Sequence, residues 1–189
     1  MIIIPTNPSA KGPVTLSGIY ASNSVTCTAG DLLMYSGYIA VVYGYNVPLP
    51  AGFTRLTPNP QFTNANHGMG WKIADSTGST VNIASGGYVF VFKNGVSIGS
   101  YGLTTLTWTD PAQYFYDPSI TLKNSDGSSY LLCCSAVVGP AAGYSVNLNI
   151  TNGSYAFHQN PNSAITTSGG AYHTYTNQGL VALIEIANS

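Results

Sequence analysis

Charge is what this sequence has least of. Five Lys or Arg and six Asp or Glu make 6% of the 189 residues charged, where an ordinary soluble domain has about 25%. Surface charge normally keeps copies of a protein apart, and this chain has little of it. The two signs nearly cancel, at a net charge of -1, which gives no electrostatic footprint for nucleic acid. The surface must therefore be covered by neutral polar groups, by ligand or by other protein.

Long apolar runs and helical periodicity are missing as well. No stretch approaches the ~20 apolar residues of a membrane span, so we expect no membrane partner. The first residues do not fit a secretory signal, because they lack a basic n-region and Pro5 ends their apolar run after three isoleucines. Gly, Pro, Asn and Ser interrupt the chain every few residues, which leaves no room for a long helix.

Cysteine is scarce, with Cys27, Cys133 and Cys134 as its only representatives. Neighbouring residues on a strand point to opposite faces, so Cys133 and Cys134 are poorly placed to bond each other. An odd count without a secretory signal predicts reduced thiols, buried as small hydrophobic side chains. One bridge from Cys27 to Cys133 or to Cys134 is the alternative.

What the chain does contain predicts a folded all-β protein. Its hydrophobic content of 44% and aromatic content of 12% set it apart from disordered chains. Many short β-rich segments between regular turn signals are typical of a sandwich or barrel. We predict a two-sheet antiparallel sandwich, jelly-roll-like, that forms a single domain over residues 14–189.

Residues 1–13 are predicted to form an extended N-terminal arm. Prolines at positions 5, 8 and 13 keep the arm extended, and its apolar tip consists of Ile2, Ile3 and Ile4. In an assembly, such an arm would dock on the sheet edge of a neighbour. In a monomer it would be a frayed terminus.

Two hairpins stand out among the predicted strands. The first spans residues 88–98 around Asn94-Gly95, a pair that tolerates the positive φ values of a type I′ turn. The second joins residues 119–122 to residues 130–134 through Asp126-Gly127. Further strands are expected over residues 32–43, 70–74, 80–84, 144–150 and 180–186, with one helical turn over residues 109–113.

The two halves of the chain echo each other faintly. Residues 24–26 and residues 119–121 both read Ser-apolar-Thr, and each precedes a glycine-containing turn and an apolar strand. Each half then ends in an apolar strand closed by Asn. Such an echo suits two related sheets packed face to face, and it does not suit a solenoid, which needs more repeats.

The titratable residues predict neither catalysis nor a metal site. Of the six carboxylates, three fall in predicted turns, two precede Pro, and Glu185 stands alone in the last strand. The histidines lie far apart and lack a spacing such as H-E-x-x-H. Residues 124–128 resemble a calcium loop but lack its further acidic positions, so a hairpin turn is the better interpretation. We expect no enzyme and no cofactor.

Tyrosine is the remaining lead to a binding surface. Its apolar ring and polar tip make it common at protein interfaces, and an exposed ring beside Asn and Ser can equally stack on a sugar. With the three isoleucines of the arm, the candidate contacts to a protein partner or a host surface glycan are Tyr43, Tyr45, Trp108, Tyr114, Tyr116, Tyr172 and Tyr175. The alternative is that these rings line the rim or the core of the sandwich.

A series of short motifs is more specific than composition. Residues 28–34 read T-A-G-D-L-L-M, residues 48–56 read P-L-P-A-G-F-T-R-L, residues 70–75 read G-W-K-I-A-D, and residues 87–92 read G-Y-V-F-V-F. In this order they resemble a β-sandwich module common in virion proteins of tailed bacteriophages, which shows GDLL, P-A-G-W-T, a Trp or Tyr strand ending in A-D, and an apolar strand. Phe53 stands where that family usually has Trp. The resemblance continues in residues 118–121, 126–128 and 181–186, and a second P-A-G-W-like element is degenerate at residues 140–144.

The resemblance implies a non-enzymatic structural protein of the virion, assembled in the host cytoplasm. The leading hypothesis is a capsid decoration or cement protein, a minor capsid protein that binds the capsid surface and copies of itself as a homo-oligomer. The alternative is a receptor- or glycan-binding module associated with the tail. No catalytic residue is carried over, because the recurring residues have framework roles. Asp31 ends a turn before a strand, residues 50–52 turn Phe53 toward the core, and Trp71 anchors the core.

Overall fold

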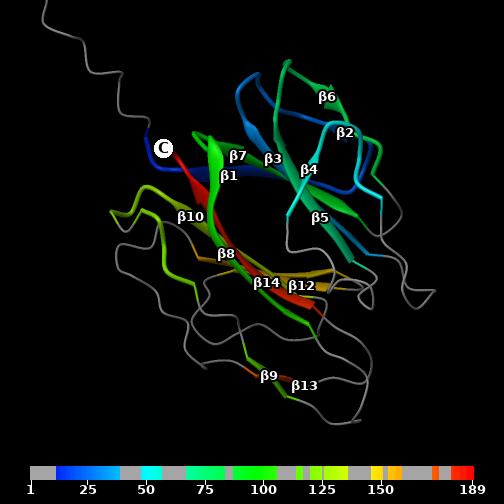
Figure 1. Cartoon of the computed structure of the whole chain (residues 1–189). Helices are drawn as coiled ribbons and strands as arrows, with labels where there is room; N and C mark the ends of the chain where they lie inside the picture. The colour runs from blue at the N-terminus through cyan, green and yellow to red at the C-terminus, as the bar shows by residue number, and fades with distance from the viewer. Residues whose placement is uncertain are drawn as a thin grey trace, which may run out of the picture.

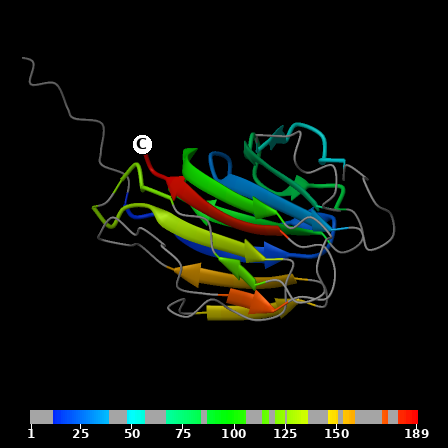
Figure 2. The same ribbon diagram turned by 60° about the horizontal axis from the view of Figure 1, so that its bottom comes forward.

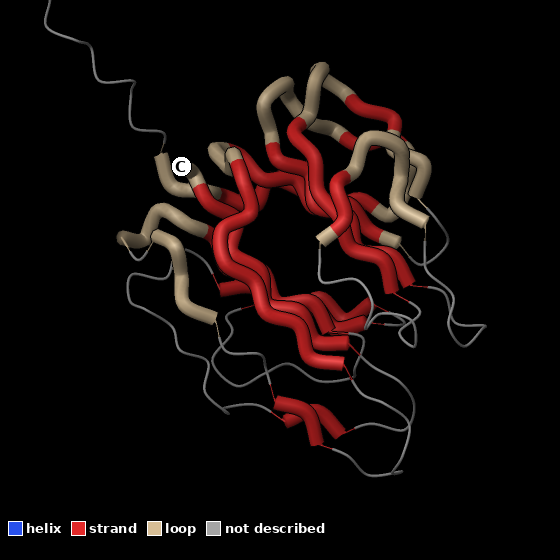
Figure 3. Tube along the Cα trace, in the orientation of Figure 1, coloured by secondary structure: helices blue, strands red, loops and turns tan. Residues whose placement is uncertain are grey.

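The computed structural model describes residues 12–38, 48–56, 67–83, 87–105, 114–116, 120–124, 126–135, 146–150, 153–158, 172–174 and 180–189. Within these ranges every regular element is a β-strand, and no segment has the helix colour in Figure 3. The prediction of an all-β fold is confirmed.

The first half of the chain builds one five-stranded sheet, with the order β1-β7-β3-β5-β4 (Figure 1). All of its neighbouring strands run antiparallel. The strands are β1 (Thr15–Tyr20), β3 (Leu32–Tyr38), β4 (Thr54–Arg55), β5 (His67–Ile73) and β7 (Tyr88–Lys93).

The second half builds the other five-stranded antiparallel sheet, with the order β11-β12-β10-β14-β8. Figure 2 shows β14, in red, between β8 and β10. The strands are β8 (Ser97–Thr105), β10 (Tyr130–Ser135), β11 (Val146–Ile150), β12 (Gly153–His158) and β14 (Leu180–Ala187). The two halves therefore form one sheet each, as the echo between them predicts. In the described strands the sheets do not exchange members, and the jelly-roll detail of the prediction is not confirmed.

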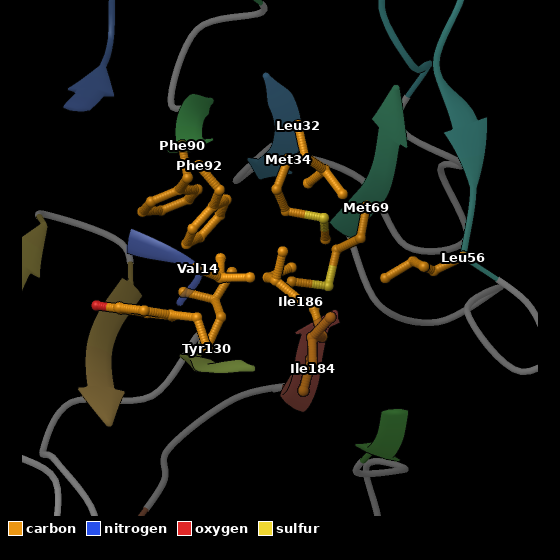
Figure 4. Packing of buried hydrophobic residues seen from close by; sticks show 12 residues of the cluster. Val14, Leu32, Met34, Leu56, Met69, Phe90, Phe92, Tyr130, Ile184 and Ile186 are labelled. Carbon is orange, nitrogen blue, oxygen red and sulfur yellow. The ribbon is translucent and has the colours of Figure 1, made fainter. Parts of the chain in front are cut away.

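The two sheets pack face to face through alternate residues of their strands. Met34 of β3 and Phe90 and Phe92 of β7 point from the first sheet toward Ile184 and Ile186 of β14 (Figure 4). All five side chains are completely buried. Burial of each such side chain contributes roughly 1.5–3 kcal/mol to folding, so this shared layer is the main core of the sandwich.

The first sheet is also covered on its other face. Leu33 and Tyr35 of β3 and Val89 and Val91 of β7 alternate with the residues of the shared core, and they are equally buried in a second cluster. The cover consists of the small ribbon of β2 (Ser24–Val25) and β6 (Ser79–Thr80) and of the segment 48–56. This double burial explains the unbroken apolar sequence of β3 and β7, which lacks the alternation of a strand with one wet face.

The outer face of the second sheet is covered at least at one end. Leu131 and Leu183 alternate with core residues of β10 and β14, and both are completely buried. The segment 120–124 contributes two further buried side chains, Ile120 and Leu122. Side chains on the outer face of the second sheet are therefore buried as well, at least at this end.

The predicted hairpin over residues 88–98 is wrong in its pairing. Both strands exist, but β7 pairs with β1 and β3, and β8 pairs with β14 in the other sheet. Asn94 has a positive φ of 62°, yet Gly95 is needed for a different reason. A Cβ atom at Gly95 would lie 2.8 Å from Ile186 Cγ2 and 3.1 Å from Leu32 Cβ. The Asn-Gly pair therefore serves a crossing between the sheets, where core side chains leave no space for a Cβ atom, and not a tight hairpin.

The second predicted hairpin is wrong as well. Gly127 has a φ of 84° and forms a turn before β10, as expected. Residues 120–122, however, are not a strand, and β10 pairs with β12 and β14. The segment 120–124 is drawn away from β10 because its backbone N–H groups bond to a side chain of β14.

The other strand predictions agree with the described residues, with different limits. Strands are present in residues 32–38, 67–73, 146–150 and 180–187, whereas only Thr80 of the predicted strand 80–84 lies in β6. The predicted burial of Cys27 is confirmed, and its thiol donates a hydrogen bond to the carbonyl of Ser76 at 3.7 Å. The helical turn at residues 109–113 and the arm at residues 1–13, apart from Gly12 and Pro13, lie outside the described residues.

Tyr130 makes the stability of the sandwich depend on pH in the alkaline range. Its ring packs against Phe92, with 5.2 Å between the ring centroids, and burial raises the pKa of its hydroxyl from 10.0 to about 12. Because the folded-state pKa is the higher one, this stabilisation is complete below pH 10.0 and is lost as the pH rises through about 12. The Tyr130→Phe variant keeps the ring but has no hydroxyl to ionise. Between pH 10.0 and about 12, we expect the free energy of unfolding of this variant to fall by roughly 2 kcal/mol less than that of the unsubstituted chain.

Urea unfolding of both chains at neutral pH and at strongly alkaline pH measures the difference. The neutral-pH measurement serves as the control, because neither chain has an ionised side chain at position 130 there. An equal loss of stability in the two chains at alkaline pH would contradict the assignment to Tyr130.

Candidate functional site

Glu185 of β14 is the most unusual polar group in the described structure. Its side chain is completely buried. Oε2 accepts hydrogen bonds from the backbone N–H groups of Ser100 and Lys123, at 2.8 and 2.7 Å. Oε1 accepts from the N–H of Asn124 at 2.9 Å and from the hydroxyl of Ser129 at 2.8 Å. A buried carboxylate without such donors would be strongly unfavourable, so these contacts are a condition for its presence.

A β-bulge in β8 creates the room for this carboxylate. Ile184 lies opposite Tyr101 and Ile186 lies opposite Ile98, so two residues, Gly99 and Ser100, face the single position of Glu185. A Cβ atom at Gly99 would lie 2.6 Å from Glu185 Cδ. Gly99 therefore leaves space for the Glu185 side chain, and Ser100 donates its backbone N–H to it.

The chemistry of the Glu185 site is structural. The four donors come from β8, from the segment 120–124 and from Ser129, which directly precedes β10, and they occupy both oxygens. The carboxylate therefore ties three segments to β14. Sequence reasoning found no partner for Glu185, because three of its four donors are backbone groups and all four lie 56 to 85 residues away along the chain.

Asp31 holds the turn that precedes β3. The N–H of Asp31 donates to the carbonyl of Thr28 at 3.0 Å, and Gly30 in between has a φ of 91°. Asp31 Oδ2 in turn accepts from the N–H of Thr28 and from Lys93 Nζ, both at 2.6 Å. Lys93 Nζ also donates to Thr28 Oγ1 at 2.8 Å. This confirms that the Gly-Asp pair is a framework turn, and it adds an ion pair that joins the turn to the end of β7.

The Pro-Ala-Gly-Phe motif likewise has a framework role. The N–H of Phe53 donates to the carbonyl of Pro50 at 3.2 Å, with Gly52 at a φ of 80°. The ring of Phe53 meets Tyr35 edge-on at 6.1 Å between centroids, and Lys72 Nζ lies 5.7 Å from its centroid. Trp71 packs against the shared core. The expected roles of Phe53 and Trp71 are therefore confirmed.

The exposed carboxylate of Asp126 also bonds locally. It accepts from the hydroxyl and the N–H of Ser128, and these two bonds lower the pKa of Asp126. Asp126 thus caps the turn at Gly127 that precedes β10, although this turn does not close the predicted hairpin. In the part of the chain that the structure describes, no three His, Cys, Asp or Glu side chains are grouped as a metal site would need.

The structure brings two of the predicted tyrosine groups together. β9 (Tyr114–Tyr116) and β13 (Tyr172–Thr174) form an antiparallel ribbon in which Tyr116 lies opposite Tyr172 and Tyr114 lies opposite Thr174. Figure 1 shows this ribbon apart from the two large sheets, beyond the second one. The remaining predicted contacts lie outside the described residues: Ile2, Ile3, Ile4, Tyr43, Tyr45, Trp108 and Tyr175.

The described residues contain no helix long and apolar enough to cross a bilayer.

Replacement of Glu185 by Gln tests the structural role of the buried carboxylate. The amide has the same shape, but its NH₂ group stands where one oxygen accepts two hydrogen bonds, so at least one buried backbone N–H loses its acceptor. We expect the free energy of unfolding to fall by roughly 2–4 kcal/mol. Urea denaturation followed by circular dichroism measures this change.

The matched control is Asp126→Asn, which neutralises an exposed carboxylate that accepts hydrogen bonds from Ser128 in its own turn. We expect this variant to unfold close to the midpoint of the unsubstituted chain. A similar loss in both variants would show that general charge removal, and not the buried site, is responsible.

Comparison with protein-family models, with curated proteins and with solved structures finds no match to this chain. The resemblance to the phage module therefore depends on the motifs in the sequence alone.

Proposed function

We propose that this chain is a non-enzymatic structural protein of a bacteriophage virion, and that it serves as a capsid decoration protein which binds the capsid surface and copies of itself. The observation that carries the proposal is the use of charge within the fold. Only eleven residues of 189 are charged, and several of them make contacts that hold the sandwich together.

Five of the described charged residues support this view. Asp31 pairs with Lys93 at 2.6 Å, and Glu185 is enclosed by four donors. Lys123 Nζ donates to the main-chain oxygen of Ser189 at 2.8 Å, and Asp126 caps its own turn. Little charge is left to keep copies of the chain apart, and a neutral polar exterior is compatible with permanent contact to other protein.

The motif residues point in the same direction. The turn of Asp31, the position of Phe53 and the packing of Trp71 are framework contacts. A site for chemistry would need acids, bases or nucleophiles that converge on one pocket, and these residues instead fix turns and core. The function that suits such a chain is binding and stabilisation of an assembly.

A second candidate function is supported by the β9–β13 ribbon. Its register sets Tyr116 opposite Tyr172 and Tyr114 opposite Thr174, and grouped tyrosines can serve glycan-binding as well as protein-binding surfaces. The alternative proposal is a tail-associated module that binds a host receptor or surface glycan through this ribbon.

Copy number in purified particles distinguishes the two proposals. A decoration protein is expected at a copy number comparable to that of the capsid subunits, and its removal should lower the temperature at which the particles release their genome. A gel of purified virions with densitometry, and thermal release assays of particles with and without the chain, measure both effects.

Each other outcome has a definite meaning. Particles that hold only a few copies, located on the tail, contradict the decoration role, and loss of host polysaccharide binding in Tyr116→Ala and Tyr172→Ala variants would then support the alternative. Particles that lack the chain contradict both proposals.

A further inference from the structure

The chain passes from the first sheet into the second through residues 94–96, between β7 and β8. The fold has separate reasons for each residue of the Asn-Gly pair at this crossing. Asn94 has a φ of 62°, a conformation that Asn adopts more readily than most residues. Gly95 is buried, and a Cβ atom there would lie 2.8 Å from Ile186 Cγ2, too close for a residue with a side chain. The packing between the sheets therefore retains a dipeptide that is chemically labile.

An Asn-Gly pair is labile because its own backbone can attack the side-chain amide. The nitrogen of Gly95 adds to Cγ of Asn94, the Cγ–Nδ2 bond breaks, and ammonia leaves with the proton of that N–H. The cyclic succinimide that results takes up water at either of its carbonyls. The product is aspartate or isoaspartate, in which the backbone runs through the side chain. A side chain on the following residue hinders the attack, and glycine has none.

Asn94 differs in this respect from the other asparagines that the structure describes. It is exposed, so water reaches its amide, and within the described ranges no other Asn precedes a glycine. Asn152 also precedes a glycine but lies outside those ranges. Asn23 offers the closest comparison, because it is exposed as well but is followed by Ser24.

The amide of Asn94 anchors the start of the sandwich. Its Nδ2 donates to the carbonyl of Pro13 at 3.0 Å, and the N–H of Val14 donates to the carbonyl of Ser128 at 2.8 Å. Val14 is completely buried in the shared core. Conversion of Asn94 to aspartate removes the donor and sets a carboxylate oxygen against the carbonyl oxygen of Pro13. Both oxygens are acceptors, so the contact is lost.

We propose that Asn94 is a modification site, at which the folded protein deamidates spontaneously and thereby releases Pro13 from the crossing between the sheets. Water is the only reactant besides the chain itself. The modification loosens the first described residues of the sandwich and leaves the pairing of β7 and β8 within their own sheets in place. The inference goes beyond the proposed virion role and does not depend on it.

Peptide mapping of the unsubstituted full chain tests the modification. The folded protein is stored for several weeks at mildly alkaline pH and physiological temperature, and a sample digested without storage corrects for conversion during the digest. The peptide with Asn94 should become heavier by one dalton, the difference between NH and O, and should contain isoaspartate. The peptide with Asn23 serves as the internal control and should stay unchanged. An Asn94 peptide that stays unchanged, or that converts no faster than the Asn23 peptide, overturns the proposal.

Asn94→Asp reproduces the product and tests its consequence. Hydrogen exchange of the Val14 N–H should become roughly tenfold faster, because the loss of an anchoring hydrogen bond makes local opening easier. The control variant is Asn23→Asp. Asn23 uses Oδ1 to accept from the N–H of Ile83 at 2.9 Å, and aspartate keeps that oxygen, so exchange at Val14 should not change. Unchanged exchange at Val14 in Asn94→Asp, or the same acceleration in both variants, contradicts the release of Pro13. If Asn94→Asp does not fold, peptide mapping of the unsubstituted chain still decides whether the site is modified.

Discussion

The buried carboxylate of Glu185 is the constraint on which the second sheet depends. An ionised group enclosed in a core is tolerated only when it is fully hydrogen-bonded, and here three backbone N–H groups and one hydroxyl supply the bonds. Displacement of β8, of segment 120–124 or of Ser129, which directly precedes β10, would leave the carboxylate short of donors. The three segments are therefore coupled through a single side chain, in addition to the apolar core that joins the two sheets.

This arrangement gives the shortage of charge a physical meaning. Asp31 and Lys93 join a turn to the end of β7, and Glu185 fixes a bulge in an edge strand, so charged groups here determine backbone geometry more than surface potential. Few charged side chains remain for the exterior, and the edge strand β8 carries none. These features are consistent with a protein that is permanently bound to other proteins, which is the basis of the proposed virion role.

The sequence predicts the architecture well and the connections poorly. Apolar runs locate β3, β5, β7 and β14, and the echo between the halves anticipates one sheet from each half. The predicted hairpin at Asn94-Gly95 is wrong because this pair instead connects the two sheets, at a point where Gly95 lies close to Leu32 and Ile186. The local sequence does not distinguish a hairpin turn from such a connection. Glu185 is missed because its donors are backbone groups distant along the chain. The pairing of Tyr116 with Tyr172 is likewise a matter of register between distant segments, which the tyrosine positions alone do not contain.

Native-state hydrogen exchange of the N–H groups of Ser100, Lys123 and Asn124 tests the coupling through Glu185 most directly. All three donate to the buried carboxylate, although they belong to different segments. If Glu185 joins these segments, the three groups open together, with one free energy that approaches that of global unfolding. Exchange of the three groups at unrelated rates, much faster than the core N–H groups of β14, would contradict the account.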